Sequence, residues 1–231
     1  MVRWTPLYNR SVDPKVRFRD LTVDEFVARL ASAEPVPGGG SAAAVAGSLG
    51  AALVAMVAAL SDRPRYAEHR HLHAEAGAAG RALADRFLSL ADEDSQAYAG
   101  FGAAMRLPRE TADDQAARAR AIRAAALVAS EVPFRTVEAC RELVGLAESL
   151  AGRCNTNAAS DLEVASLLAV AASHAAAANV TVNLPSIGDE VRAAELQRTT
   201  DGLVDEIDRL AATARAHVHG GEARSPLAGP A

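Results

Sequence analysis

The sequence predicts an all-α protein, and three observations support that prediction. Alanine makes up about a quarter of the 231 residues and aromatic residues only 4%, a balance typical of closely packed helices rather than of β-sheets. Apolar residues recur at steps of three and four over long stretches, as on one face of a helix. No stretch alternates between apolar and polar residues as a half-buried strand does. We therefore expect one helical bundle with a core of its own.

Capping residues, prolines and glycines divide the chain into helices. We expect an extended arm over 1–20, a helical domain over 21–219 and a disordered tail over 220–231. Thr22 and Ser160 are each followed three residues later by Glu, which predicts two capping boxes, and Pro133 is expected to kink or divide its helix. The helices are expected from Thr22 to before Pro35 and over about 42–60, 66–105, 111–151, 160–179 and 189–216.

Charge and cysteine content narrow the class of protein. The net charge of −5 argues against a general nucleic-acid binder, because no basic excess neutralises phosphates. Cys140 and Cys154 lack metal-binding spacing, and no signal peptide pattern opens the sequence, so we expect a cytoplasmic protein with reduced thiols and no metal. The uncharged run 42–60 is long enough to span a bilayer, but its small residues and the lack of a second such run favour a buried helix and no membrane.

The segment PVPGGGS, residues 35–41, precedes the most apolar predicted helix. Backbone N–H groups at a helix N-terminus can bind an anion or a polar ligand, and Gly38, Gly39 and Gly40 would let that ligand approach. The same glycines could instead form a tight turn that lets two helices pack closely. The phosphate-binding pattern GxxxxGK[ST] is absent, and the residues alone leave both interpretations open.

Asp94 lies within an apolar helical stripe formed by Leu83, Phe87, Leu90, Tyr98, Phe101 and Met105. A carboxylate on such a face is costly unless it is hydrogen-bonded or paired. It is therefore either a structural hydrogen-bonding partner or a functional acid. Its neighbours Asp92 and Glu93 point to other sides of the helix, where we expect solvent.

A second group of polar residues surrounds Asp161. This carboxylate fits the first turn of a helix, where it complements the helix dipole, but the preceding Asn155 and Asn157 carry amides that could also read a polar heterocycle. Asn179 and Asn183 could bind a ligand or satisfy backbone groups where their helix stops. Each of these residues has a structural and a functional interpretation.

Three histidines are expected to be structural or solvated. His69 and His73 have the spacing of a metal pair, but the segment EHRHLHAE is rich in charge and offers no third ligand, so a solvated face is expected. His174 lies among alanines and is expected to be a buried core histidine.

Taken together, the motifs resemble the cyclodeaminase/cyclohydrolase family. The resemblance covers about residues 21–215, in order and spacing. Its most specific elements are PGGGS before an Ala/Gly/Leu helix, D-x-x-A-Y followed by LP, and N-x-N-x-x-S-D. It implies a helical homodimer that converts one-carbon units on tetrahydrofolate without a metal or organic cofactor.

The resemblance also implies which residues form the folate site. Asp94 and Asp161 would be the catalytic carboxylates, with the rest of the site formed by Pro37, Gly38, Gly39, Gly40, Ser41, Tyr98, Asn155, Asn157, Ser160 and Asn179. Where the family often has lysines before a tyrosine, this chain has Asp62-Arg63-Pro64-Arg65-Tyr66. Arg63 and Arg65 keep positive charge for the folate glutamate tail, but Pro64 changes the loop.

The expected reaction is hydrolysis of 5,10-methenyltetrahydrofolate to 10-formyltetrahydrofolate, since no formiminotransferase segment precedes the domain in this sequence. Cyclodeamination of 5-formiminotetrahydrofolate with release of ammonia needs similar groups and stays open. A third alternative is a non-catalytic dimer that binds folate or a protein partner, and the altered loop keeps it open.

Overall fold

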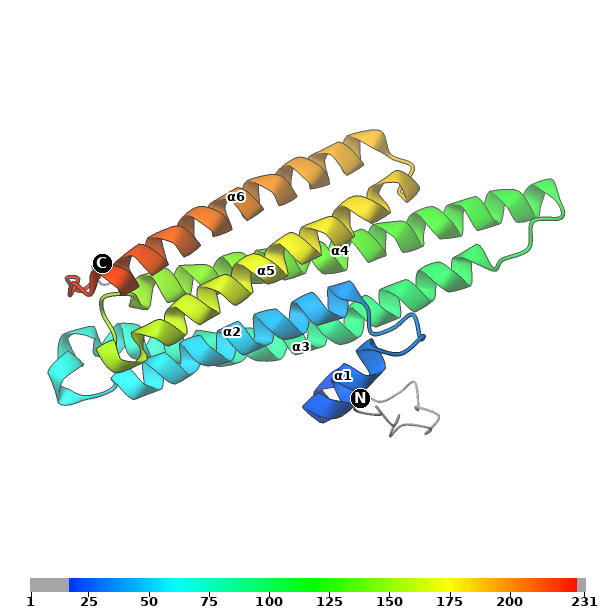
Figure 1. Cartoon of the computed structure of the whole chain (residues 1–231). Coiled ribbons are helices and arrows are strands. Elements are labelled where there is room, and N and C mark those ends of the chain that lie inside the picture. Colours follow the sequence, from blue (N-terminus) through cyan, green and yellow to red (C-terminus); the bar gives the residue numbers. More distant parts are fainter. Residues whose placement is uncertain (1–16, 228–231) are drawn as a thin grey trace, which may run out of the picture.

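The computed structural model describes residues 17–227, which form helices and turns without a strand and confirm the all-α prediction. Helices α2 to α6 run lengthwise beside one another, whereas the short α1 lies outside their bundle (Figure 1). The bounds are α1 Val23–Leu30, α2 Gly39–Ser61, α3 Arg70–Met105, α4 Ala112–Leu150, α5 Ala159–Asn183 and α6 Glu190–Gly220.

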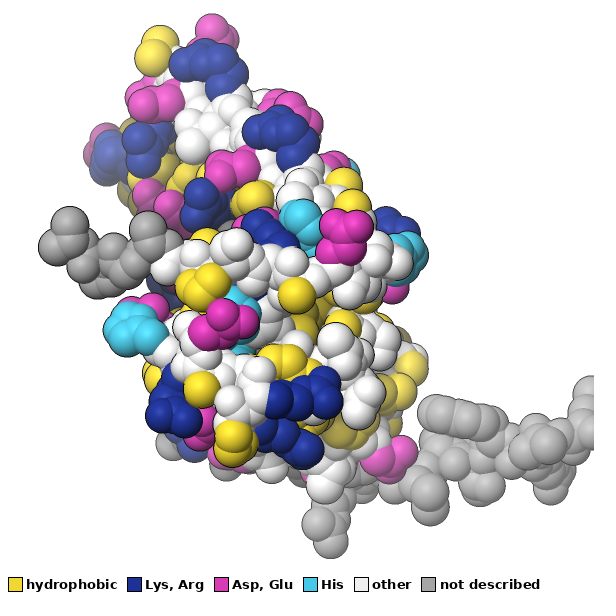
Figure 2. Space-filling model, turned by 90° about the vertical axis from the view of Figure 1, so that its left-hand side faces the viewer, with side chains coloured by type: hydrophobic (Ala, Val, Ile, Leu, Met, Phe, Trp, Pro, Cys, Tyr) yellow, Lys and Arg dark blue, Asp and Glu magenta, His cyan; other side chains and the backbone are white. Residues whose placement is uncertain are grey.

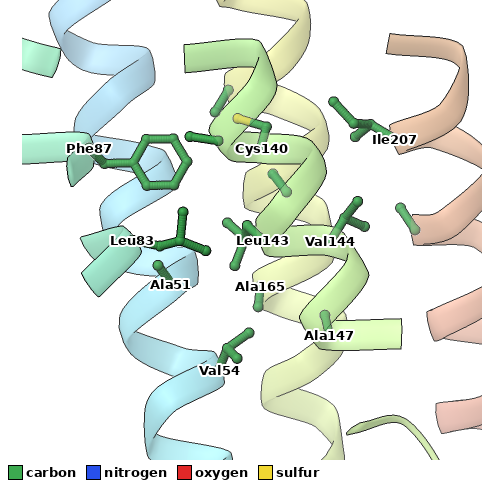
Figure 3. Packing of buried hydrophobic residues seen from close by; sticks show 14 of the residues in the cluster. Ala51, Val54, Leu83, Phe87, Cys140, Leu143, Val144, Ala147, Ala165 and Ile207 are labelled. Carbon is green, nitrogen blue, oxygen red and sulfur yellow. The ribbon is translucent and has the colours of Figure 1, made fainter. Parts of the chain in front are cut away.

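The core is built from small residues on neighbouring helices. Figure 3 shows Ala51 and Val54 of α2 facing Leu83 and Phe87 of α3 and Leu143 of α4, all of them buried. Gly47 allows this close packing, because a Cβ there would lie 2.5 Å from the ring of Phe87. The alanine-rich composition therefore brings helix axes close together.

Several helix ends differ from the prediction. Helix α2 begins at Gly39, so Gly39 and Gly40 form its first turn and are not part of a loop. A 3₁₀ segment, η2 (Pro64–His69), precedes α3, which therefore begins at Arg70. The capping box at Thr22 is confirmed, with the Thr22 hydroxyl accepting from the N–H of Glu25.

Pro133 does not divide α4, which continues from Ala112 to Leu150. Proline lacks the N–H that would reach the carbonyl of Ala129 one turn earlier. The side-chain amide of Asn183 donates to that carbonyl at 2.9 Å instead. Of the two roles considered for Asn183, the structural one is thus observed, and it explains why the helix tolerates the proline.

The two terminal segments are bonded to the bundle where they are described. Phe18, in the 3₁₀ turn η1 (Phe18–Asp20), donates its N–H to Asp92 of α3 at 2.7 Å, so the end of the expected arm is docked and Asp92 is not simply solvated. Arg224 donates its N–H to the carbonyl of Gly152 at 2.8 Å, which departs from a free tail. The rest of the arm, 1–16, and 228–231 lie outside the described residues.

His174 is not a core residue as expected. It is exposed on α5 and lies 3.1 Å from the carboxylate of Asp208 on α6.

Two stretches are long and apolar enough to cross a membrane, α2 and Thr156–Ser186 around α5. The expectation of a single such run is therefore wrong. Just over half of the most apolar window of α2 is buried inside the bundle, so much of its apolar surface is used against the neighbouring helices.

Candidate functional site

The N-terminal end of α2 is capped by a residue from another helix. Gly38 occupies the N-cap position and has no side chain to bond the free N–H groups of the first turn. Asp94 of α3 takes this role, because its Oδ2 accepts from the Ser41 hydroxyl at 2.8 Å and its carboxylate also accepts from the Ser41 backbone. Ser95 lies beside the pair, with its Oγ 3.3 Å from that of Ser41.

Gly39 and Gly40 differ in how much space a side chain would have at each position. A Cβ on Gly40 would overlap the Asp94 carboxylate and lie 2.6 Å from its Cγ, so only glycine admits the carboxylate there. A Cβ on Gly39 would lie 3.8 Å from the amide nitrogen of Asn179, an ordinary contact. Gly39 is exposed, so its side of the first turn is open to solvent.

Burial raises the pKa of the half-buried Asp94 carboxyl, against the lowering effect of its bonds from Ser41. A carboxyl whose pKa rises towards neutrality can both accept and return a proton. Tyr98, one turn further along α3, is 53% exposed, so the buried part of the predicted stripe ends near Asp94.

The C-terminal end of α2 holds the loop between α4 and α5. Asn155 donates its N–H to the Ser61 hydroxyl at 2.8 Å and its side-chain amide to the carbonyl of Leu60 at 3.3 Å. The Tyr66 hydroxyl accepts from the N–H of Thr156 at 3.1 Å. Asn155 is buried, and its bonds hold the loop in place, which is a structural role.

Arg63 and Arg65 lie in the altered loop at this same end. Arg65 stacks over the ring of Tyr66, bonds its hydroxyl, and donates to the Thr156 hydroxyl at 3.2 Å. Arg63 is exposed at the start of η2.

His69 and His73 are buried here, at 5% and 3% exposure, so the expected solvated face is wrong. The charged residues of this segment point outwards, whereas the two imidazoles face inwards with ring centroids 6.1 Å apart. His73 Nε2 lies 2.7 Å from the carbonyl oxygen of Arg153. Within residues 17–227, no group of three or more His, Cys, Asp or Glu side chains could hold a metal.

Asp161 is half-buried in the first turn of α5, next to the exposed Ser160. The capping box predicted at Ser160 is not formed, because α5 already begins at Ala159 and the 3₁₀ turn η3 (Thr156–Ala158) leads into it. Asn157 is exposed and donates its N–H to the side chain of Asn155 at 3.1 Å.

The two predicted catalytic carboxylates do not meet within one chain. Asp94 contacts the first turn of α2, whereas the loop before Asp161 contacts its last residues. The contacted residues, Ser41 and Ser61, are 20 residues apart in α2, which at 1.5 Å per residue separates them by about 30 Å. In one chain these residues therefore form two separate groups: Gly38–Ser41 with Asp94 and Asn179, and Tyr66 with Asn155 and Asp161.

A groove of about 660 Å³ between α3 and α4 contains neither carboxylate. Glu93 and Arg135 lie on its wall, 2.5 Å apart, so Glu93 is paired rather than only solvated. On the end of the molecule that carries η2, positive and negative side chains alternate in the upper part of the view, whereas basic side chains gather in the lower part (Figure 2).

Comparison with known proteins identifies the fold and the family. The sequence pattern of the formiminotransferase-cyclodeaminase family matches residues 22–202. The chain belongs to this family. It is 36% identical over 190 residues to the methenyltetrahydrofolate cyclohydrolase of Methylorubrum extorquens, covering 82% of this chain and 91% of that protein.

Two further proteins match most of this chain. The formimidoyltransferase-cyclodeaminase of Sus scrofa is 32% identical over 192 residues, which are 81% of this chain but 35% of that longer protein. The crystal structure of formiminotetrahydrofolate cyclodeaminase from Thermotoga maritima superposes with a TM-score of 0.79 at 24% identity, covering 87% of this chain and 98% of that one.

Sequence reasoning missed four polar residues that contact these two groups. Ser95 directly follows Asp94, and Ser61 ends the apolar run of α2, so their positions were visible but carried no motif. Tyr66 and His73 bond the backbone of a loop that follows about 80 residues later. No periodicity or spacing signals such a contact, since it depends on how the helices pack.

Proposed function

We propose that this protein hydrolyses 5,10-methenyltetrahydrofolate to 10-formyltetrahydrofolate. The observation that carries the proposal is the Asp94 carboxyl, held with a raised pKa at the open first turn of α2. A carboxylate there attracts the cationic methenyl group. The relationship to a protein named methenyltetrahydrofolate cyclohydrolase, along nearly its whole length, supports this choice.

In the proposed reaction, Asp94 transfers a proton twice. It first accepts a proton from the water whose oxygen bonds to the methenyl carbon. It then gives that proton to N5 as the C–N5 bond breaks, while the new hydroxyl loses its own proton to solvent and becomes the formyl oxygen. One proton is released per turnover, so the charge of the substrate cation is balanced.

The expected test is loss of methenyltetrahydrofolate absorbance, measured with purified protein against the buffer rate. A rate no higher than that of buffer would contradict the proposed hydrolysis. The alternative, cyclodeamination of 5-formiminotetrahydrofolate, is favoured by the relatives that carry that activity in their names, and ammonia release from that substrate would identify it. Failure with both substrates, together with measurable folate binding, would favour the non-catalytic alternative.

We also propose that the enzyme is a homodimer paired through α2 and α5. These adjacent helices expose large apolar side chains, among them Leu49, Met56, Leu60, Val164, Leu167 and Val182, and α2 has no charged residue. A patch of this kind favours association with another surface. We expect sedimentation of the wild type as a dimer and of Leu49→Arg as a monomer.

The dimer would also complete the site. A twofold axis crossing α2 near its middle pairs the two α2 helices antiparallel. The Asp94 end of one chain then faces the Asp161 end of the other. The two groups of residues, which lie far apart in one chain, would then form one site across the interface.

Mixing two inactive variants tests this arrangement. A dimer of one Asp94→Asn and one Asp161→Asn chain has one site with both carboxylates intact and one site with neither. After exchange of subunits, we expect about a quarter of wild-type activity if association is random. If both carboxylates of a site came from the same chain, the mixture would stay inactive.

The remaining expectations form part of the same proposal. Asp94 supplies proton transfer without an organic cofactor or metal, and unchanged turnover after dialysis against a chelator would support this. We place the protein in the cytoplasm, without membrane or nucleic-acid partners. Cys140 and Cys154 are free thiols buried in the protein. Burial raises the pKa of Cys140 to about 12.

A further inference from the structure

A polar cluster lies at the C-terminal end of α2. Three side chains from the segment that turns from α2 into α3 bond successive backbone groups of one loop, 153–157. His73 contacts the carbonyl of Arg153, Ser61 accepts from the N–H of Asn155, and Tyr66 accepts from the N–H of Thr156. Four residues later, this loop leads to Asp161.

Of the two residues that make these contacts from the α3 side, His73 is more deeply buried than Tyr66. Its ring stands edge-on to that of Tyr66, with the centroids 6.5 Å apart, and beside that of His69. The carbonyl of Arg153 can only accept, so Nε2 of His73 carries the hydrogen and donates it at 2.7 Å.

The other ring nitrogen shows which form of His73 makes this bond. Nδ1 of His73 and Nδ1 of His69 are buried and have no hydrogen-bond partner among the described residues. A lone pair on Nδ1 can remain unpaired at modest cost, whereas a proton there would be a buried donor without an acceptor. Nε2 is therefore the nitrogen that carries the hydrogen in the bond to Arg153.

We infer that His73 is a positioning residue, which fixes loop 153–157, and through it Asn157 and Asp161, by donating from Nε2 to the carbonyl oxygen of Arg153. The inference rests on the proposed function insofar as Asp161 takes part in substrate binding or catalysis. Its structural half, the anchoring of the loop, is independent of any activity.

The test compares three variants of the full-length protein. His73→Leu removes the donor, whereas His73→Gln keeps it, because the glutamine amide nitrogen reaches about as far as Nε2. His71→Leu is the matched control, two residues away, with a side chain that is 73% exposed. Hydrogen exchange of the Asn155 and Thr156 amides reports loop anchoring, and the separate values of KM and kcat report the site.

For His73→Leu we expect amide exchange at least about tenfold faster, the effect of losing one buried hydrogen bond. KM for methenyltetrahydrofolate should rise by a similar factor, whereas kcat changes less. His73→Gln should restore most of both values, and His71→Leu should match the wild type.

Unchanged exchange and KM in a folded His73→Leu would overturn the inference, as would His73→Gln behaving like His73→Leu. If His73→Leu does not fold, His73→Asn gives the same test, because its shorter amide does not reach the carbonyl oxygen of Arg153. Wild-type protein without turnover would contradict the proposed function, while the exchange experiment would still decide the anchoring role.

Discussion

The two ends of α2 combine polar side chains with backbone groups, but in different ways. At the first turn, the Asp94 carboxylate lies against the glycines with its pKa raised by burial, and Gly39 leaves one side open. At the last turn, the side chain of Asn155 and the hydroxyl of Tyr66 are bonded to backbone on several sides, and little of Asn155 is exposed.

This difference matches the roles proposed for the two ends, proton transfer at the first turn and positioning of the loop at the last. A carboxyl that is desolvated without a cationic partner is kept at a cost in stability, which is common in catalytic sites. A buried amide with its bonds satisfied stabilises the fold and fixes what is attached to it. We therefore expect substitutions at the first end to affect turnover most, and those at the second end to affect stability and binding.

Asp94→Asn should give the largest effect, a loss of kcat of at least about a hundredfold, the usual scale for a lost acid–base group.

The same substitution should increase the stability of the fold at neutral pH. The pKa of Asp94 is raised on folding, so its favourable contribution is complete below about pH 4, the unfolded value, and is lost as pH rises through the folded value. We expect a higher melting temperature than wild type at pH 7.5, and near-wild-type kcat would remove Asp94 from the reaction.

Gly40→Ala and Gly39→Ala form a matched pair at the same turn. The added methyl group overlaps the Asp94 carboxylate only at position 40, so we expect activity to fall by more than tenfold there, the scale of displacing a catalytic group by about 1 Å. Gly39→Ala meets only the Asn179 amide at 3.8 Å and should keep its melting temperature. Weaker substrate binding in Gly39→Ala would identify this turn as part of the folate site, whereas equal effects of both variants on activity and stability would contradict the steric argument.

At the other end, His69→Gln should have the smallest effect, visible only in the pH dependence of stability. Burial lowers the pKa of His69, Glu68 opposes the lowering, and the charge of Arg153 adds to it. Since the unfolded chain binds the proton first, wild-type stability should fall as pH decreases below about 6.5.

The measurement for His69→Gln is the change in melting temperature between pH 7.5 and pH 5.5. That change should be smaller in the variant than in wild type, whereas His71→Gln, on the exposed side, should leave it as it is. An identical change in wild type and His69→Gln would show that His69 does not sense this pH range.

Much of the fold could be predicted because its causes are local. Thr22 and Thr111 cap their helices with residues three positions away, and the bonds they make are those expected of such pairs. The same pattern is present at Ser160, but the helix begins one residue earlier. A local pattern therefore does not always fix where a helix begins. Local patterns also fail at Pro133. The helix continues through this proline because the side chain of Asn183, 50 residues further on, replaces the missing bond.

By itself, the sequence determined the helical class, the family motifs and the presence of glycines and carboxylates suited to folate chemistry, because composition and short spacings fix these. Only the tertiary structure decided which end of α2 each motif occupies. Asp94 reaches the first turn because Gly40 has no side chain, and Asn155 reaches the last because Ser61 and Tyr66 bind its loop. Contacts between residues 50 to 95 positions apart depend on how whole helices pack, and no local pattern encodes them.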